Sequence, residues 1–461
     1  MKTEFDLIVV GSGSGLDVAN AAANSGLKVA IIESGPIGGT CLNRGCIPSK
    51  MLLHVADLAE TIRSANRFSV NTQNISIDFR KIVDEVSNYV DRESKDLGAY
   101  LEGIDNPRLF RGTAKFIGYK QLKVGSTIME ADKILIASGA RPRIPELPGL
   151  KKSRYITSRE ALRLEELPES LAIIGGGGYI AVELAHYFGS LGSKVYIIQR
   201  SDRLLTMEDE EISRKFTKDF ERKHEVLLSS KPVMIKKSGG FYEIDIRSIR
   251  NENNRAIRVR ELIVAVGVTP NTDLLKPEKS GVLLDKEGYV VVDQYLETNV
   301  KGIFALGDAI GRYMLKHTAN LEAQFIYYNI IDYTSKISVN YNAIPHAVFT
   351  SPQIAAVGLT EQEAKIRNID FVVGKYNYID TGMGIALKDD SGFVKIVVEK
   401  DTRKILGCHI MGTQASTLIH EVVIAMSSGS GTLENITGAV HVHPALPEVV
   451  LRAAISAREA L

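Results

Sequence analysis

A strand, a glycine-rich turn, a helix and a second strand follow one another at the start of the chain. Residues 5–10 form an apolar run typical of a buried parallel strand, the turn Gly11, Gly13 and Gly15 follows, and a helical pattern continues to residue 23. The next strand, residues 28–33, ends in Glu33. Glycines let a backbone approach a pyrophosphate, and such an acid accepts hydrogen bonds from ribose hydroxyls. This order predicts a Rossmann-like dinucleotide-binding domain, although Leu16 stands where the fingerprint has its third glycine.

The same pattern returns in the middle of the chain. Residues 171–174 predict a strand, the turn Gly176, Gly177 and Gly178 follows, and a helix and a strand at residues 194–199 complete the unit. No acid ends this second strand, where Arg200 and Arg203 lie instead. Guanidinium groups suit a 2′-phosphate, so the second nucleotide is predicted to be NADP rather than NAD. Because surface arginines are common, an ordinary solvated loop stays an alternative.

The rest of the chain predicts how these units are divided into domains. A length of 461 residues indicates two or three domains, and buried strands are expected at residues 133–140, 262–267 and 302–308, the last ending at Asp308. From about residue 342 the pattern changes to alternating strands and helices. We therefore predict an α/β fold with two Rossmann-like dinucleotide-binding domains and a C-terminal α+β domain. Their expected bounds are 1–145 with 270–341, 146–269, and 342–461.

Charge and cysteine content narrow the functional classes. Lys and Arg number 56 against 55 for Asp and Glu, so no net charge points to nucleic acid or to an anionic membrane. The apolar runs are far shorter than the roughly 20 residues of a membrane span. Three cysteines do not make an extracellular disulfide framework, and the first strand leaves no room for a secretory signal. A cytoplasmic protein acting on small molecules or on protein partners is expected.

Two of the three cysteines, Cys41 and Cys46, lie five residues apart just after the first nucleotide motif. Five residues of regular helix rise about 7.5 Å, whereas the Cα atoms of a disulfide lie roughly 4.4–6.8 Å apart. The backbone is therefore expected to leave regular helix at Gly45, and Pro48 suits the start of a new helix. A bond closed under this constraint is expected to be labile and catalytic. A metal site is not predicted, because the nearby histidine and the third cysteine make no zinc spacing; two buried unpaired thiols stay an alternative.

Together these motifs resemble the flavoprotein disulfide reductases over the whole chain. The segment from Cys41 to Cys46 is similar to the redox motif of that family, and residues 441–448, which contain His443 and Glu448, resemble its base motif. The resemblance implies a homodimer that binds FAD in the first domain and NAD or NADP in the second, with a C-terminal dimerisation domain. It also implies that His443 acts across the subunit boundary as general base and that Glu448 orients its ring.

The resemblance further implies individual roles. Cys41, expected to be the more exposed thiol, exchanges with substrate, while Cys46 faces the flavin; Lys50 and Glu183 form an ion pair beside it, and Tyr179 covers it until nicotinamide arrives. FAD contacts are expected from Gly11, Gly13, Gly15, Glu33, Gly39, Thr40, Ala114, Ser138, Gly139, Asp308, Met314, Leu315 and His317. NAD(P) contacts are expected from Gly176, Gly178, Tyr179, Ile180, Arg200, Arg203 and Gly267.

The substrate is less clearly indicated, because the motifs mix features of several members of the family. The redox motif favours oxidation of protein-bound dihydrolipoamide with reduction of NAD(P)+, which would make lipoyl domains of a 2-oxoacid dehydrogenase or of a glycine cleavage system possible partners. The alternative is an NADPH-dependent reductase of a low-molecular-weight disulfide, similar to mycothione or glutathione reductases. A flavin-binding redox sensor without turnover is the alternative from a different functional class.

Overall fold

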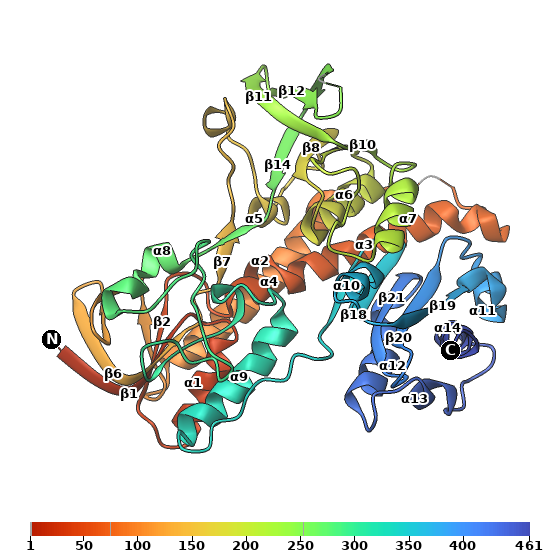
Figure 1. The fold of residues 1–461 in the computed structure, drawn as a ribbon. Helices are drawn as coiled ribbons and strands as arrows, with labels where there is room; N and C mark the ends of the chain where they lie inside the picture. The colour runs from red at the N-terminus through yellow and green to blue at the C-terminus, as the bar shows by residue number, and fades with distance from the viewer. Residues whose placement is uncertain (1, 74, 252) are drawn as a thin grey trace.

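A seven-stranded sheet whose central strands are parallel (the first parallel sheet), a four-stranded sheet (the second parallel sheet) and a five-stranded antiparallel sheet organise the described part of the chain in the computed structural model (Figure 1). Two smaller antiparallel sheets, of three and two strands, complete it. The structure describes residues 2–73, 75–251 and 253–461. The architecture confirms the predicted α/β class with a C-terminal α+β part. Within the described ranges, no helix combines the length and the apolar character needed to cross a bilayer.

The first parallel sheet is built around β1 (Lys2–Val10), which pairs with β2 (Val29–Glu33) on one side and with β6 (Thr127–Ile136) on the other. The apolar side chains of β1 are buried on both faces of the sheet. The other strands are β3 (Arg108–Arg111) and β16 (Ile303–Ala305), which are parallel to their neighbours, and β5 (Gln121–Val124) and β4 (Ala114–Gly118), of which β5 pairs antiparallel with β6 and β4 antiparallel with β5. Helices α1 (Gly15–Asn24) and α9 (Lys316–Ile331) share a core with this sheet. The carboxyl ends of β1, β6 and β16 meet at one edge, since Val10 and Ala305 both lie opposite Ile136.

The second parallel sheet has four strands in the order β10-β9-β8-β14 and lies at the top of Figure 1. Its inner strand β8 (Ser170–Gly175) runs into the second glycine turn, after which α6 (Tyr179–Leu191) begins. The other elements are β9 (Lys194–Ile198), α7 (Glu210–Phe220), β10 (Glu225–Leu227), β14 (Glu261–Ala265) and a separate antiparallel sheet of β11 (Ser230–Ser238), β12 (Phe241–Ser248) and β13 (Asn254–Val259). One core joins α6 to α3 (Cys46–Ser64) and α4 (Phe79–Glu102), which come from the first domain.

Two short strands carry the chain between the two parallel sheets. β7 (Ala140–Pro142) leaves the first sheet and β15 (Val268–Pro270) returns to it, and the two strands pair antiparallel. The chain therefore passes between the two parallel sheets close to residues 140 and 268. The expected domain bounds at residues 145, 269 and 341 stay predictions.

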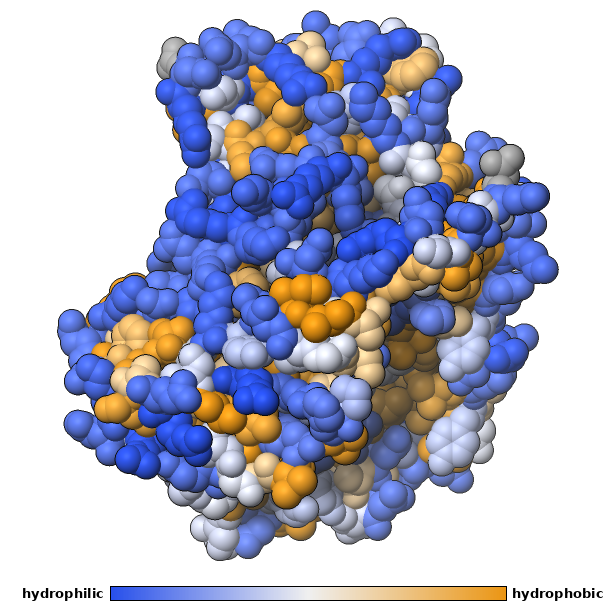
Figure 2. Space-filling model, turned by 90° about the vertical axis from the view of Figure 1, so that its right-hand side faces the viewer, coloured by the Kyte–Doolittle hydropathy of each residue, from blue (hydrophilic) through white to orange (hydrophobic). Residues whose placement is uncertain are grey.

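The C-terminal part is a five-stranded antiparallel sheet in the order β17-β18-β21-β20-β19. Its strands are β17 (Pro345–Val348), β18 (Gln353–Gly358), β19 (Phe371–Asn377), β20 (Phe393–Glu399) and β21 (Ile405–Gly412). Helices α12 (Ala415–Ser427) and α14 (Pro447–Glu459) share its core; α10 (Glu361–Ile366), α11 (Gly382–Leu387) and α13 (Glu434–Thr437) complete it. Figure 2 views the molecule from this side and shows apolar side chains between hydrophilic ones. In the loop before α14, Val440 and Val442 are highly exposed.

Candidate active site

At the first glycine turn, two backbone segments pass very close to each other. Gly11 has a φ of +107°, and a β-carbon there would lie 2.2 Å from the carbonyl oxygen of Ala137. Gly39 has a φ of +64°, and its β-carbon would lie 2.8 Å from the Cα of Gly13. Glycine is therefore required at both positions. A β-carbon on Gly13 would meet no atom within 4 Å, so this backbone faces open space in which a pyrophosphate could approach it.

The missing third glycine of the fingerprint has a structural explanation. At Gly15, the first residue of α1, a β-carbon would lie 2.8 Å from the side chains of Val9 and Ala137. Leu16 is instead buried in the core beneath the turn. Gly15 therefore permits the close contact of helix and strand that the third glycine usually provides. Gly15 lies one residue before the position, occupied by Leu16, at which the fingerprint has its third glycine.

Glu33 is held beside the first turn by three hydrogen bonds. Its Oε2 accepts from the amide of Ser12 at 2.9 Å and from the Ser12 hydroxyl at 2.8 Å, while its Oε1 accepts from the amide of Gly35 at 2.7 Å. The carboxylate is thus fixed at the carboxyl end of β2, next to the open face of Gly13. A fixed acceptor at this place suits the hydroxyls of a ribose.

A cavity of about 560 Å³ opens at the carboxyl edge of the first sheet and reaches to α6. Its volume falls within the range of about 300–1,000 Å³ that is usual for small-molecule sites. Burial raises the pKa of the Asp308 carboxyl at its wall. The predicted residues that line it are Gly11, Gly13, Glu33, Gly39, Thr40, Cys41, Cys46, Lys50, Ala114, Ser138, Gly139, Tyr179, Ile180, Glu183, Asp308, Met314 and Leu315. Gly15 and His317 lie outside this lining; the His317 ring bonds the carbonyl of Pro345 at 2.7 Å.

The two cysteines lie on either side of a break between helices. Cys41 is inside α2 (Gly39–Arg44), Gly45 follows that helix, and Cys46 begins α3. A β-carbon on Gly45 would lie 2.9 Å from the carbonyl oxygen of Thr40, so glycine allows the two helices to meet at this angle. The break confirms the predicted departure from regular helix. It brings the two thiols within hydrogen-bonding distance of each other at the wall of the cavity.

The two thiols have opposite protonation tendencies. The hydrogen bond from Cys41 lowers the pKa of Cys46 to about 7, with Lys50 acting in the same direction, and the same bond raises the pKa of Cys41. The N-terminus of a helix also favours a thiolate at Cys46. The expectation that Cys41 is the more exposed thiol is wrong. Cys46 is exposed and Cys41 is half-buried, because Cys41 lies within α2 while Cys46 is the first residue of α3.

An ion pair connects α3 to α6 at the side of the cavity. The Nζ of Lys50 lies 3.0 Å and 3.2 Å from the two carboxylate oxygens of Glu183, one of which also accepts from the amide of Phe349 at 3.0 Å. Burial raises the pKa of Glu183, and Lys50 opposes this shift. Tyr179, the first residue of α6, lies at the same wall and is 40% exposed. A cation held here can stabilise negative charge on a group bound in the cavity.

His443 and Glu448 form a separate pair at the start of α14. The ring Nδ1 of His443 lies 2.8 Å from Oε1 of Glu448, whose Oε2 accepts from the amide of Ala445 at 3.2 Å. This hydrogen bond with His443 lowers the pKa of Glu448. With Nδ1 engaged, Nε2 of His443 is turned outward on a side chain that is 76% exposed. The pair is outside the lining of the cavity of its own chain.

The second glycine turn begins one residue earlier than the sequence indicated. Gly175 has a φ of +141°, and a β-carbon there would lie 2.2 Å from the carbonyl oxygen of Ala265, as at Gly11 and Ala137. Gly177, and not Gly176 or Gly178, therefore corresponds to Gly13. This register cannot be chosen from the sequence, because four successive glycines, residues 175–178, fit the fingerprint in more than one register. Only the contact with β14 distinguishes them.

The end of β9 carries an amide where the first domain carries a carboxylate. Gln199 accepts a hydrogen bond from the amide of Arg200 at 3.1 Å and donates one to the carbonyl of Arg203 at 3.3 Å. Arg200 is exposed. Arg203 lies 3.4 Å from Asp202 and has a buried Nε without a hydrogen-bond partner. Gly267, the remaining predicted NAD(P) contact, has open space where its β-carbon would be.

Comparison with protein families covers nearly the whole chain. Residues 5–323 match the family model "Pyridine nucleotide-disulphide oxidoreductase", and residues 344–454 match the dimerisation domain of the same family. The chain belongs to the pyridine nucleotide-disulphide oxidoreductases.

Relatives of two kinds are found among the proteins similar to this oxidoreductase. It is 36% identical to mycothione reductase of Mycobacterium tuberculosis, with 98% of this chain and 99% of the relative covered. It is 34% identical to dihydrolipoyl dehydrogenase of Chlamydia pneumoniae, with 99% and 98% covered. Among solved structures, a Cu(II) complex of the HOCl-induced flavoprotein disulfide reductase RclA from Escherichia coli has a TM-score of 0.86 and 26% identity over 98% of this chain and 99% of that one.

Members of the family use FAD and NAD(P)H, and the residues present fit these cofactors. In the oxidoreductase the open backbone at Gly13, the fixed carboxylate of Glu33 and the adjoining cavity form a cradle for a dinucleotide such as FAD. When bound, FAD supplies a two-electron carrier between a nicotinamide and the cysteine pair. The dimerisation domain supports a homodimer.

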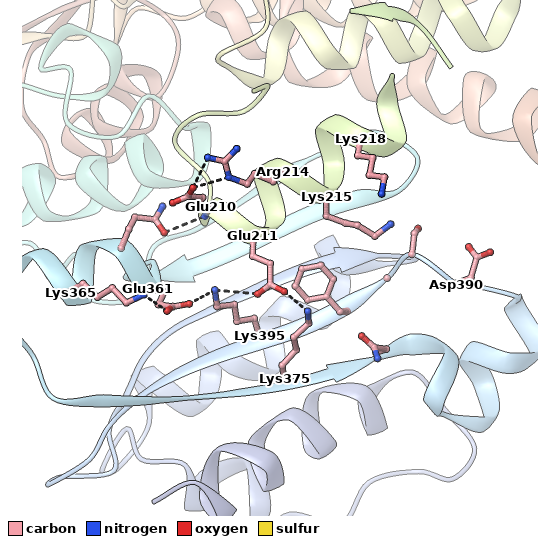
Figure 3. Close-up of a pocket in the computed structure, with 15 residues that line it drawn as sticks. Glu210, Glu211, Arg214, Lys215, Lys218, Glu361, Lys365, Lys375, Asp390 and Lys395 are labelled. Atoms are coloured by element: carbon pink, nitrogen blue, oxygen red, sulfur yellow. Dashed lines mark hydrogen bonds and ion pairs between the residues drawn. The ribbon is translucent and has the colours of Figure 1, made fainter. Parts of the chain in front are cut away.

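A second hollow of the oxidoreductase, about 600 Å³, lies between α7 and the C-terminal sheet, away from the cysteines (Figure 3). At its floor the Nζ of Lys395 lies 2.9 Å from Asp209, 2.6 Å from Glu361 and 3.5 Å from Glu211. Lys395 and Asp209 are 3% and 0% exposed. These four side chains, here called the interdomain charge cluster, join the second parallel sheet's domain to the C-terminal domain. No motif in the sequence predicts this cluster.

Proposed function

We propose that this oxidoreductase uses NADPH to reduce a low-molecular-weight disulfide through Cys41 and Cys46. The observation that carries the choice of nucleotide is the end of β9, where Gln199 replaces a carboxylate and Arg200 and Arg203 follow. A carboxylate there would repel a 2′-phosphate, whereas guanidinium groups attract one. The 36% identity to a mycothione reductase supports the same direction of reaction.

We assign the attack on the substrate to Cys41 and the closing of the disulfide to Cys46, as the family resemblance implies. The sulfur of Cys41 attacks one sulfur of the substrate disulfide, which releases the first substrate thiol and leaves a mixed disulfide on Cys41. The thiolate of Cys46 then attacks the Cys41 sulfur, releases the second thiol and closes the Cys41–Cys46 disulfide, so the substrate gains two electrons and the cysteine pair loses two. NADPH supplies the electrons that reopen this disulfide. Since the pKa of Cys41 is raised, its thiol needs a base before it can attack.

We assign that base to His443 of the partner subunit. The ring is exposed, its Nδ1 is held by Glu448, and its Nε2 is left to take the proton from Cys41 and pass it to the leaving thiolate. His443 lies in the dimerisation domain and outside the cavity lining of its own chain. In a homodimer, His443 of the partner subunit would reach the cavity that His443 of the same chain does not line.

Oxidation of protein-bound dihydrolipoamide is the second candidate, as the redox motif favoured. It uses the same cysteines in the opposite direction and would make lipoyl domains the partners. It is supported by relatives named dihydrolipoyl dehydrogenase, at 34% identity over 99% of this chain.

One experiment separates the candidates. The pure enzyme is assayed with NADPH or NADH and small disulfides, including those of mycothiol and glutathione, and with dihydrolipoamide and NAD+ or NADP+. We expect NADPH-dependent disulfide reduction, and at least a tenfold rise in KM for NADPH in an Arg200→Ala and Arg203→Ala double variant. The matched control is Arg258→Ala on β13, which should change neither the rate of disulfide reduction nor the KM for NADPH. Dihydrolipoamide turnover without disulfide reduction would overturn the first candidate.

A further inference from the structure

A row of polar side chains runs along the buried contact between α3 and α6, behind the cavity. Helix α3 contributes residues separated by seven, three and three positions, and α6 contributes residues separated by three and four, so each set lies on one helical face. We call them the α3–α6 polar row: Lys50, Asp57, Glu60 and Arg63 from α3, and Glu183, His186 and Ser190 from α6. Burying charged groups between helices is costly unless each is paired and hydrogen-bonded. The row therefore calls for a reason beyond packing.

His186 lies at the centre of this row and is 1% exposed. Its Nε2 lies 2.7 Å from a carboxylate oxygen of Asp57. Its Nδ1 lies 3.1 Å from the hydroxyl of Ser190 and 3.5 Å from a carboxylate oxygen of Glu60. The Ser190 hydroxyl also lies 3.3 Å from a carboxylate oxygen of Glu60, to which it can donate. Both ring nitrogens of His186 are thus engaged, one with Asp57 on α3 and the other with Ser190 on α6 and Glu60 on α3.

The carboxylates that flank His186 have partners of their own. Asp57 is 40% exposed and reaches solvent, while Glu60 also pairs with Lys223. Burial lowers the pKa of the neighbouring His224 to about 3. One turn earlier on α6, burial raises the pKa of Glu183, and Lys50 acts in the opposite direction.

We propose that His186 is a positioning residue for the reaction: as a buried ring that contacts Asp57 on α3 and Ser190 on its own helix, it fixes α3 against α6. Helix α3 begins with Cys46 and carries Lys50 one turn later, while α6 begins with Tyr179 and carries Glu183 one turn later. A fixed register between the two helices holds all four side chains at the wall of the cavity. The inference rests on the proposed role of Cys46 as the thiolate beside the flavin.

The test compares His186→Leu with the wild-type enzyme, both loaded with FAD. Leucine fills a similar volume and leaves Asp57 hydrated and Glu60 paired with Lys223, so the variant is expected to fold. After two-electron reduction, we expect at least a threefold loss of the long-wavelength absorbance that a thiolate gives beside oxidised flavin. We also expect about a tenfold fall in kcat with little change in KM for NADPH. His54→Leu, which removes an exposed histidine from the same helix, should change none of these values.

A second variant keeps the test decisive where leucine prevents folding. His186→Gln retains a hydrogen bond toward Asp57 and loses the contact with Ser190, so about half of the absorbance loss of the leucine variant is expected. Absorbance and kcat within twofold of wild type in folded His186→Leu, or an unchanged absorbance in His186→Gln, would overturn the role of His186 alone. A wild-type enzyme without this absorbance would overturn the role of Cys46, and the inference with it.

Discussion

Two buried lysine–carboxylate contacts in this molecule have the same chemistry and opposite surroundings. At the cavity, Lys50 is 35% exposed and Glu183 is its one ion-pair partner among the described residues. In the interdomain charge cluster, Lys395 is 3% exposed and has Asp209, Glu211 and Glu361 around it. Burial raises the pKa of Glu183, whereas hydrogen bonds from Lys365 and Lys395 lower the pKa of Glu361.

The difference teaches how to separate a functional ion pair from a structural one. The carboxylate at the cavity is incompletely compensated, so its charge and that of Lys50 respond to what binds beside them. In the interdomain cluster, Glu361 also pairs with Lys365 and Glu211 with Lys375, so the carboxylates around Lys395 are compensated without a ligand. Because they come from both domains, the cluster holds the domains together. Judged by burial alone, the interdomain charge cluster would look more important for function than the Lys50–Glu183 pair.

The largest expected effect is on stability, from Lys395→Met. The change leaves the fully buried carboxylate of Asp209 without its ammonium partner, and removing one member of a buried pair costs about 3–5 kcal/mol. The free energy of unfolding in urea measures this cost. Lys375→Met is the matched control, because Lys375 pairs with the same Glu211 at 41% exposure and should cost less than about 1 kcal/mol. Equal losses of unfolding free energy in the two variants would contradict the distinction between the buried Lys395 and the exposed Lys375.

Lys50→Met should lower turnover and leave stability nearly unchanged. Turnover is expected to fall about 100-fold, equivalent to about 2.7 kcal/mol, because the cation beside the cavity is lost. The free energy of unfolding should change by less than about 1 kcal/mol, since Lys50 is partly exposed and Glu183 can take up a proton. Steady-state kinetics and urea unfolding of the same preparation measure both. A loss of stability as large as that of Lys395→Met would contradict the comparison.

A smaller effect is expected from Glu361→Gln in the interdomain cluster. Lys395 keeps Asp209 and Glu211, so the cost is limited to about 1–2 kcal/mol for one hydrogen bond to a charged group. The same urea measurement tests it. A cost above that of Lys395→Met would mean that Glu361, and not the lysine, is the centre of the cluster.

The smallest expected effect is a shift in the pKa of Cys46 at the cavity. The pKa of Cys46 is lowered to about 7, so its thiolate is present above that pH and is lost as the pH falls through it. Lys50 contributes to this lowering, and Lys50→Met should therefore move the midpoint upward by up to about one pH unit. The long-wavelength absorbance of the reduced FAD-loaded enzyme, followed against pH, measures the midpoint. A downward shift would contradict the assigned electrostatics.

Much of the first domain could be predicted from the sequence because its signals are local. The strand before Gly11, the turn and the strand ending at Glu33 follow one another within thirty residues, and the break at Gly45 follows from helix geometry. The partners Lys50 and Glu183, 133 residues apart, came from the family resemblance and not from spacing.

What could not be predicted depends on contacts between distant segments. The register of the second turn is set by the carbonyl of Ala265, which no local pattern reveals. The exposure of Cys46 relative to Cys41 follows from how α2 and α3 meet the cavity. Lys395 and Asp209 are 186 residues apart, and in the sequence each looks like an ordinary surface charge.

Spectra of the two single-cysteine enzymes test most directly the claim that Cys46 is a low-pKa thiolate at the flavin cradle. The FAD-loaded Cys41→Ser and Cys46→Ser variants are compared above pH 7 without reductant. Cys41→Ser should show the long-wavelength absorbance of a thiolate beside oxidised flavin, and Cys46→Ser should lack it. The same band in Cys46→Ser, or its absence from Cys41→Ser at every pH up to 9, would contradict the account.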